Sequence, residues 1–453
     1  MNTYGAIETA RFFQRMGLQQ AALLNSMAAV ASAGSPLLRG AFEANAATAE
    51  LWAHEGEESD FNITHTEHKG ITHFVEEEHV KISGHTTLLR FNAPTIKEEQ
   101  PKVLVIAPLS GHDETLLKPT VQELIPDHHV SIVKWHNPKH VSLEEHGSFD
   151  LNTYIHDLQK CLEEMGPNTH VVAVCQPGVP LVALLSAMEE QGHPCLPISA
   201  TFKGSPIDTS VSPTKVNEGP QKLKQIWGGS QGAIDNHYAH MLSEVTSPHR
   251  GQGQVVHHGL TQLGGFYGLD PQSHAKAHIE NWFNIAFSQN SKDVERHDTF
   301  YKGYNHVMDL PGEYLMQTLD VAFLNQRIKD GTFRYTNPET RHVHQVDPAN
   351  IQNTALFAVE GAGDTITGLG QTVALLDMAT NLDPSMKRYR RSPKGHYGLF
   401  AGGDFRDETA PEVRGFIREI EAHHSVGNDH ETHKDVRKPN AFTIDNHPEL
   451  QRH

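Results

Sequence analysis

Cys175 lies in the segment Ala173-Val-Cys-Gln-Pro-Gly-Val-Pro180, between an apolar run and a run with helical periodicity. A cysteine at a turn from a strand into a helix can act as a nucleophile, because the helix dipole stabilises its thiolate. Pro177 and Pro180 fit such a turn, because the first N–H groups of a helix lack intrahelical partners. In the usual G-x-S-x-G form of this turn, glycines stand where this chain has Ala173 and Pro177, and serine stands where it has Cys175. Taken alone, the segment also allows a buried structural cysteine.

An acid and a histidine follow Cys175 along the chain, each directly after a predicted strand. Asp364 follows the apolar run 355–359, and His396 lies in a Gly-His-Tyr-Gly loop after the run 388–391. The carboxyl ends of parallel strands meet at one edge of a sheet. The order nucleophile, acid, histidine is that of the α/β-hydrolases. We therefore expect His396 to deprotonate Cys175 or to hold it as an ion pair, with Asp364 orienting the imidazole ring.

Acyl transfer by such a triad needs two N–H donors for the oxyanion that forms at the carbonyl. We expect the backbone of Gln176, next to the nucleophile, to supply one. The other should come from Ser110 or Gly111, in a small-residue turn after the run 103–107. An ordinary turn between a strand and a helix is the alternative interpretation of these two residues.

The elements that must position these groups alternate between strand and helix from residue 102 onward, which predicts an α/β protein with a mostly parallel sheet. Strands are predicted at 103–107, 130–135, 171–174, 197–202, 355–359 and 388–391, and helices at 116–124, 151–165, 179–188, 370–379 and 411–422. The alternation stops near Gly204, and helix-like stretches at 280–287 and 312–323 lie within the interruption. The fold expected is an α/β-hydrolase with a largely helical cap insertion.

These patterns divide the chain into five parts. We expect a helical segment at 1–55, the first part of the hydrolase core at 56–204, a cap at 205–350, the second part of the core at 351–424 and a polar, His-rich tail at 425–453. Short alternating runs at 61–64, 71–75 and 80–83 predict antiparallel strands before the core. Within the cap, residues 255–267 are expected to border the active-site cleft.

The pattern of the N-terminal segment predicts two helices that are separated at Gly34-Ser-Pro36. Phe12, Phe13, Met16 and Leu18 form an apolar stripe in the first helix. Packing of this stripe on the body of the protein is the commoner use of such a face. An exposed docking face is the alternative.

Composition excludes several classes of protein. The 453 residues carry a formal net charge of −18, which disfavours nucleic acid as a partner. No apolar stretch predicts a transmembrane segment. The three cysteines cannot form a disulfide framework, which suits a reducing cytoplasm. Neither a P-loop nor a dinucleotide-binding glycine motif is present, so no cofactor is expected.

The chain contains 33 histidines, and some lie close together in sequence. His65/His68, His342/His344 and His430/His433 are spaced as metal ligands can be, but none has a cysteine or carboxylate at zinc spacing. Close pairs arise by chance at this histidine content, so no metal site is expected. His257-His258, within the predicted cap, is a candidate for lining the active site.

Ten segments in order between residues 100 and 400 carry a family resemblance. They are Val174–Pro180, Ala107–His112, Trp135–Pro138, Pro206–Thr209, Pro213–Asn217, Met308–Pro311, Val346–Pro348, Glu360–Gly361, Gly368–Gln371 and Gly395–Gly398. Together they resemble the intracellular polyhydroxyalkanoate (poly-3-hydroxybutyrate) depolymerases. The chain departs from that pattern at Ser205, where glycine is expected, and at Gly178, where a larger residue is usual.

The resemblance implies a Cys-Asp-His triad at Cys175, Asp364 and His396 and hydrolysis of a water-insoluble polyester through an acyl-enzyme. It implies a cytoplasmic protein at the surface of polyester granules, with coenzyme A as an alternative acyl acceptor to water. Whether the protein forms a homo-oligomer is left open. A polyhydroxyalkanoate synthase is the alternative enzyme, although Gln176-Pro177 differs from the G-x-C-x-G turn of synthases. A non-catalytic granule-surface protein is the alternative outside enzymes.

Overall fold

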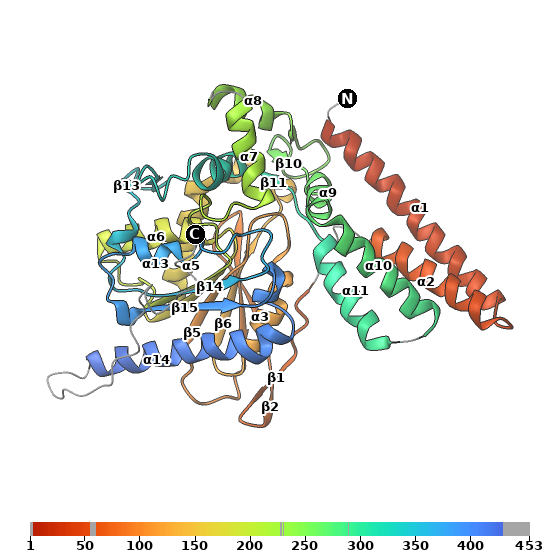
Figure 1. Ribbon diagram of the computed structural model, residues 1–453, viewed down its shortest axis with the longest axis horizontal. Helices are drawn as coiled ribbons and strands as arrows, with labels where there is room; N and C mark the ends of the chain where they lie inside the picture. The colour runs from red at the N-terminus through yellow and green to blue at the C-terminus, as the bar shows by residue number, and fades with distance from the viewer. Residues whose placement is uncertain (1–2, 55–59, 227–228, 230, 289, 429–453) are drawn as a thin grey trace.

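A sheet of eight strands forms the centre of the computed structural model, which describes residues 3–54, 60–226, 229, 231–288 and 290–428 (Figure 1). The strand order is β3-β4-β6-β5-β7-β8-β14-β15. The strands are β3 (Glu76–Lys81), β4 (Thr86–Asn92), β5 (Lys102–Ile106), β6 (His129–Trp135), β7 (Thr169–Val174), β8 (Ser199–Lys203), β14 (Ala355–Gly361) and β15 (Lys387–Ser392). β4 pairs antiparallel with both β3 and β6, and the six strands from β6 to β15 are parallel.

Helices cover both faces of this sheet, as buried parallel strands require. On one face, α3 (Lys118–Leu124) and α14 (Ala410–Asn428) contribute Val121, Phe416 and Ile417 to a core with Val105 of β5. On the other face, α5 (Leu151–Met165), α6 (Gly178–Gln191) and α13 (Ala374–Met378) close a second core. The α/β-hydrolase fold expected from the sequence is confirmed.

Most of the predicted core elements are present, and the differences are local. β4 was not predicted, and 61–64 forms no strand although Phe61 and Ile63 are buried. The strand expected at 71–75 is β2 (Ile71–Phe74), which pairs with β1 (His65–His68) rather than with the main sheet. The helix expected at 370–379 is only the short α13.

The segment 205–350 lies between β8 and β14, which are neighbours in the sheet. It contains the helices α7 (Lys215–Ile226), α8 (Gln231–Ala239), α9 (Gly259–Leu269), α10 (Pro271–Ala286), α11 (Ser291–Asn305) and α12 (Gly312–Thr318), followed by a π-helical turn, η3 (Leu319–Leu324). Short strands form two small sheets: β9 (Leu242–Glu244), β10 (Val255–His257) and β11 (Leu310–Pro311) in one, and β12 (Arg334–Thr336) and β13 (Val343–Gln345) in the other. The exact domain boundaries stay a prediction.

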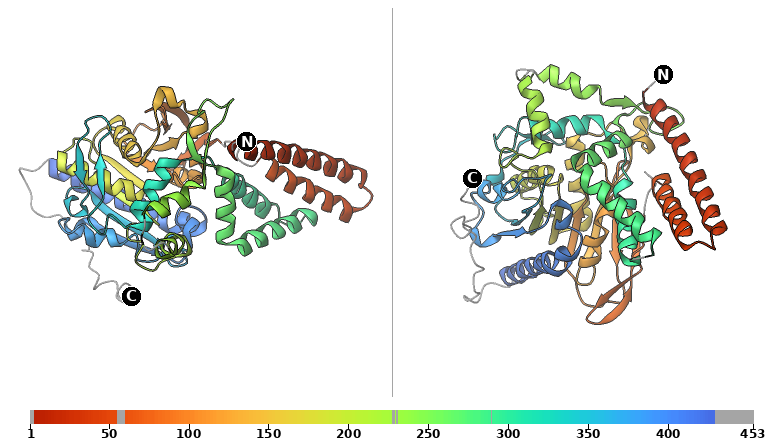
Figure 2. Two further views of the ribbon diagram at one scale, coloured as in Figure 1. Left: turned by 90° about the horizontal axis from the view of Figure 1, so that it is seen from above. Right: turned by 45° about the vertical axis from the view of Figure 1, so that its right-hand side comes forward.

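The N-terminal residues form a helical hairpin of α1 (Thr3–Ala31) and α2 (Pro36–Ala53), which projects from the side of the molecule next to α10 and α11 (Figures 1 and 2). The expectation that its aromatic stripe packs on the body is wrong, because Phe12 and Phe13 are 59% and 67% exposed. The hairpin packs through small residues instead. α2 approaches α10 so closely that a Cβ on Gly40 would lie 1.9 Å from the carbonyl oxygen of Ala286.

Residues 425–428 continue α14, and the remainder of the predicted tail lies outside the described residues. Among the helices that the structure describes, none has both the length and the hydropathy needed to cross a lipid bilayer.

Candidate active site

Cys175 occupies the turn between β7, which ends at Val174, and α6, which begins at Gly178. Its φ is +67°, in the left-handed region that side chains other than glycine rarely adopt. Two backbone hydrogen bonds hold the turn. The N–H of Cys175 donates to the carbonyl of Lys203 at 2.7 Å, and the N–H of Gly178 donates to the carbonyl of Cys175 at 3.1 Å. Strain of this kind marks functional turns, and here it fixes a thiol at the carboxyl edge of the sheet.

Asp364 and His396 lie together at the same edge, after β14 and β15. The imidazole Nδ1 of His396 is 2.7 Å from Oδ2 of Asp364, and the two side chains are 7% and 1% exposed. The other carboxylate oxygen accepts hydrogen bonds from the N–H groups of Ile366 and Thr367 at 2.8 and 2.9 Å. Backbone donors thus fix the carboxylate, and the carboxylate fixes the ring.

Cys175 is one of the groups that shift the pKa of His396. Burial alone would lower the pKa of His396, but the neighbouring Cys175 and Asp364 raise this pKa well above its usual range. Both the charge of Cys175 and a hydrogen bond to it contribute to the rise. The structure therefore brings together the three residues that the sequence analysis singled out.

The candidate oxyanion donors lie in two turns. In the part of the chain that the structure describes, no acceptor meets the backbone N–H groups of Gln176, Ser110 or Gly111. Gly111 has a φ of +111°, and a Cβ there would lie 2.6 Å from Oε1 of Gln262 in α9. Its carbonyl accepts from the N–H of Met308 at 2.7 Å. This turn is therefore held in place by residues of the insertion.

Aromatic side chains of the insertion surround this region. The ring of His112 lies 4.4 Å from Phe266 and 5.0 Å from Tyr304, and Tyr397, next to His396, lies 5.7 Å from Tyr304 (all centroid distances). Burial, with His306 and His396 nearby, lowers the pKa of His112 to about 3, so this imidazole is neutral. None of these side chains had a role predicted from the sequence, although Phe266 lies in the segment expected to border the cleft.

Lys203 is another residue without a predicted role. It ends β8 beside Cys175, and its side chain is 1% exposed with the ammonium 4.5 Å from the ring centre of Phe405. Burial lowers the pKa of Lys203 to about 7. Lys203 directly follows the strand predicted at 197–202, and the sequence gives no sign that its side chain will be buried.

The side chains of His257 and His258 form hydrogen bonds with groups outside the triad. His257 bonds through Nδ1 to the carbonyl of Met241 at 2.9 Å, and His258 bonds through Nε2 to Glu8 of α1 at 3.0 Å. His258 therefore links the insertion to the N-terminal hairpin, whereas the bond of His257 stays within the insertion.

Among the described residues, one group of potential metal ligands lies together: Glu190, His342 and His344. His344 Nδ1 is 2.9 Å from one carboxylate oxygen of Glu190, and His342 Nε2 is 3.9 Å from the other. The spacing of His342 and His344 indicated a pair of possible ligands. It did not indicate Glu190, because this residue is distant along the chain. Glu190 lies near the C-terminal end of α6, about 18 Å along the helix axis from Gly178 at the other end, so the group takes no part in the site. His430 and His433 lie outside the described residues.

The strand order, with Cys175 after β7, Asp364 after β14 and His396 after β15, is that of an α/β-hydrolase. Residues 204–421 match the family described as the PHB de-polymerase C-terminus. Over this part, just under half of the chain, the sequence matches the PHB depolymerase family. The match confirms the resemblance seen in the sequence and supports an ester hydrolase. The match includes Asp364 and His396, whereas Cys175 precedes it.

Solved structures similar to the chain include a bromoperoxidase from Bacillus anthracis, with 11% identity and a TM-score of 0.38 over 76% of this chain and 100% of that chain. A carboxylesterase from Nitrososphaera gargenis has 12% identity and a TM-score of 0.39 over 77% and 100%. A 2-hydroxy-6-oxo-6-phenylhexa-2,4-dienoate hydrolase from Rhodococcus sp. strain RHA1 has 10% identity and a TM-score of 0.38 over 76% and 99%. No curated protein matches the chain. The fold assignment rests on the strand order.

Proposed function

We propose that the protein is a polyhydroxyalkanoate depolymerase that cleaves ester bonds of poly-3-hydroxybutyrate through an acyl-enzyme on Cys175. The observation that carries the proposal is the convergence of Cys175, His396 and Asp364 from the ends of three strands. The left-handed backbone of Cys175 and the 2.7 Å contact between His396 and Asp364 support a triad rather than a structural cysteine.

In the proposed reaction, the Cys175 thiolate attacks the ester carbonyl, and the N–H groups of Gln176 and of Ser110 or Gly111 bind the oxyanion. His396 gives its proton to the leaving hydroxyl as the carbon–oxygen bond breaks. It then takes a proton from water, which attacks the thioester and releases the 3-hydroxyacyl group as a carboxylate. Asp364 keeps the ring oriented and stabilises its positive charge.

Access to Cys175 would pass the aromatic side chains Phe266, Phe300 and Tyr304 of the insertion. An aromatic lining suits a mobile, apolar polyester chain that enters one segment at a time. The proposed enzyme therefore degrades amorphous polymer faster than crystalline polymer at matched surface area.

The exposed face of the N-terminal hairpin supports a place at the granule surface. Leu23, Leu24 and Met27 of α1 and Leu37 and Leu38 of α2 are each more than half exposed. No charged residue occurs from residue 16 to 38, so this face suits an uncharged polyester surface better than an ionic one. We propose cytoplasmic polyester granules as its partner.

The test incubates the purified protein with amorphous granules and, separately, with 3-hydroxyacyl-coenzyme A, and identifies products by mass. Soluble hydroxy acids from granules support the proposal, and new polymer from the thioester would identify a synthase. Sedimentation with granules without release of product would leave only a surface protein. Added coenzyme A distinguishes the acceptors, because it would yield a thioester product in place of the free acid.

A further inference from the structure

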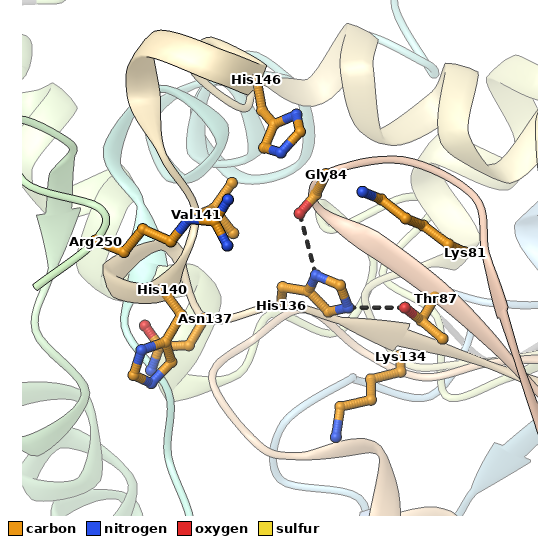
Figure 3. Close-up of a pocket in the computed structure, with 10 residues that line it drawn as sticks. All are labelled: Lys81, Gly84, Thr87, Lys134, His136, Asn137, His140, Val141, His146 and Arg250. Atoms are coloured by element: carbon orange, nitrogen blue, oxygen red, sulfur yellow. Dashed lines mark hydrogen bonds between the residues drawn. The ribbon is translucent and has the colours of Figure 1, made fainter.

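A cavity of about 310 Å³ lies between the β3–β4 turn, the loop after β6 and the loop of the insertion that carries Arg250 (Figure 3). None of Cys175, Asp364 or His396 lines it, so it is separate from the candidate active site. Three basic side chains and three imidazoles contribute to its lining: Lys81, Lys134, Arg250, His136, His140 and His146. No aspartate or glutamate of the described residues lines the cavity.

The charge of this lining contrasts with that of the whole chain, which is −18. Among the residues that the structure describes, Glu145 and Glu114 approach the cavity from outside its lining. Glu145 contacts Arg250 at 2.6 Å, and Glu114 lies 3.4 Å from Lys134. Burial, with Asp113 nearby, raises the pKa of Glu114 to about 8, which weakens its negative charge at neutral pH. In the described part of the chain no carboxylate pairs with Lys81, so the cavity keeps a positive charge.

Close backbone contacts hold the walls of the cavity. A Cβ on Gly84 would lie 2.2 Å from the ring of His146, so only glycine lets that imidazole approach. His136 donates through Nδ1 to the carbonyl of Gly84 at 3.1 Å, and its Nε2 lies 2.9 Å from the hydroxyl of Thr87, as Figure 3 shows. These contacts fix the core side of the site before any ligand arrives.

The side of the cavity that belongs to the insertion is fixed as well. The N–H of Gly251, next to Arg250, donates to the carbonyl of Lys139 at 2.8 Å. A Cβ on Gly251 would lie 2.0 Å from the carbonyl oxygen of Pro138, so the two backbones touch. Arg250 therefore approaches the cavity from a segment that is anchored to the core, and a ligand would bridge the two parts.

We infer that this cavity binds the oxyanion group, carboxylate or phosphate, of a small molecule, with Lys81 and Arg250 as its principal cationic contacts. Its volume lies at the lower end of the usual range for small-molecule sites, roughly 300–1,000 Å³. Two sources have this chemistry. One is the hydroxy acid that polyester hydrolysis releases, a choice that rests on the proposed function, and the other is a phosphate compound.

The test is calorimetric titration of the full-length protein at fixed ionic strength with 3-hydroxybutyrate, its uncharged methyl ester and inorganic phosphate. Lys81→Gln and Arg250→Gln each remove one cation of the cavity. Arg39→Gln is the matched control, because Arg39 is also exposed and pairs with a glutamate, Glu43, at 2.8 Å. We expect at least one anion to bind, both cavity variants to weaken it about tenfold or more, and the control and the ester to show no effect.

The probe that binds identifies the source of the oxyanion. Phosphate binding that depends on Lys81 and Arg250 would support the site even if the protein released no product from polyester. Absence of binding by either anion, equal weakening in the Arg39 control, or equal binding of the methyl ester would overturn the inference.

Discussion

Gly178 and Ser205 share one space beneath the turn that holds Cys175. A Cβ built on Gly178, the first residue of α6, would lie 2.4 Å from both Cβ and Oγ of Ser205, which follows β8. These are the two positions at which the sequence departs from the pattern of the depolymerases, one smaller and one larger than expected. The two departures therefore compensate for each other.

Gly178→Ala should destabilise the protein by about 1–3 kcal/mol, because the added methyl group overpacks a buried contact. Ser205→Gly removes the obstructing side chain, so Gly178→Ala in combination with Ser205→Gly should recover most of the loss. Denaturant unfolding of the two single variants and the double variant measures the coupling. Additive effects of the two substitutions would show that the residues do not compete for space.

Cys175→Ala should abolish ester hydrolysis while the fold is retained, because the attacking sulfur is assigned to this residue alone. Cys161→Ala and Cys195→Ala are the controls. Cys161 is buried in α5 and Cys195 lies between α6 and β8, so both variants should keep turnover. Release of hydroxy acid from granules, with circular dichroism as the measure of folding, checks all three. Substantial turnover by Cys175→Ala would disprove the mechanism.

Asp364→Asn should lower both kcat and the pKa of His396. Asp364 and Cys175 together raise that pKa well above its usual range, so removing the carboxylate charge lets His396 lose its proton at lower pH. The alkaline limb of the rate profile, where the general acid is deprotonated, should move toward neutral pH. The rate should fall by roughly 10²–10⁴.

The profile of Asp330→Asn, which changes an exposed carboxylate of the insertion, should match the wild type. An unchanged alkaline limb in Asp364→Asn would mean that Asp364 does not act on His396.

Lys203→Met should raise the free energy of unfolding near neutral pH. The pKa of Lys203 falls from 10.5 to about 7 on burial, so the unfolded chain binds the proton more tightly and stability rises with pH between these values. Replacement by an apolar side chain removes this cost, which is on the order of 3–5 kcal/mol at pH 7. Denaturant unfolding of both proteins at pH 7 and pH 9.5 tests it. Equal differences at the two pH values would contradict the assignment of a buried, neutral lysine.

Some elements of the fold could be predicted from short stretches of sequence alone. The helix expected at 151–165 is α5 with the same bounds, because Asp150 caps its N-terminus and Gly166 ends it. β4 was missed because its pattern does not alternate: it lies between two strands, and both its faces are largely buried. Phe61 and Ile63 gave a strand-like pattern because they are buried, but burial alone does not supply a pairing strand.

The candidate site also contains residues that could be predicted from the sequence and contacts that could not. Cys175, Asp364 and His396 could be found from sequence, since each directly follows a predicted strand. The contacts of Gln262 and Met308 with the Gly111 turn could not, because they depend on how the insertion folds back over the sheet. The exposure of Phe12 and Phe13 was missed for a related reason: an apolar stripe does not show whether a partner surface lies within the same chain.

The pairing of β8 with β14 has a consequence for how the protein is made. About 150 residues separate these neighbouring strands along the chain, and closing a flexible loop of that length costs about 4 kcal/mol in entropy. During synthesis, the edge of β8 that β14 later covers has no partner until residues 355–361 leave the ribosome. β8 is buried throughout in the folded protein, so a nascent chain that stalls within the insertion presents an unpaired strand edge that the complete protein covers. Such chains should aggregate, and the yield of active protein depends on how quickly the ribosome passes the insertion.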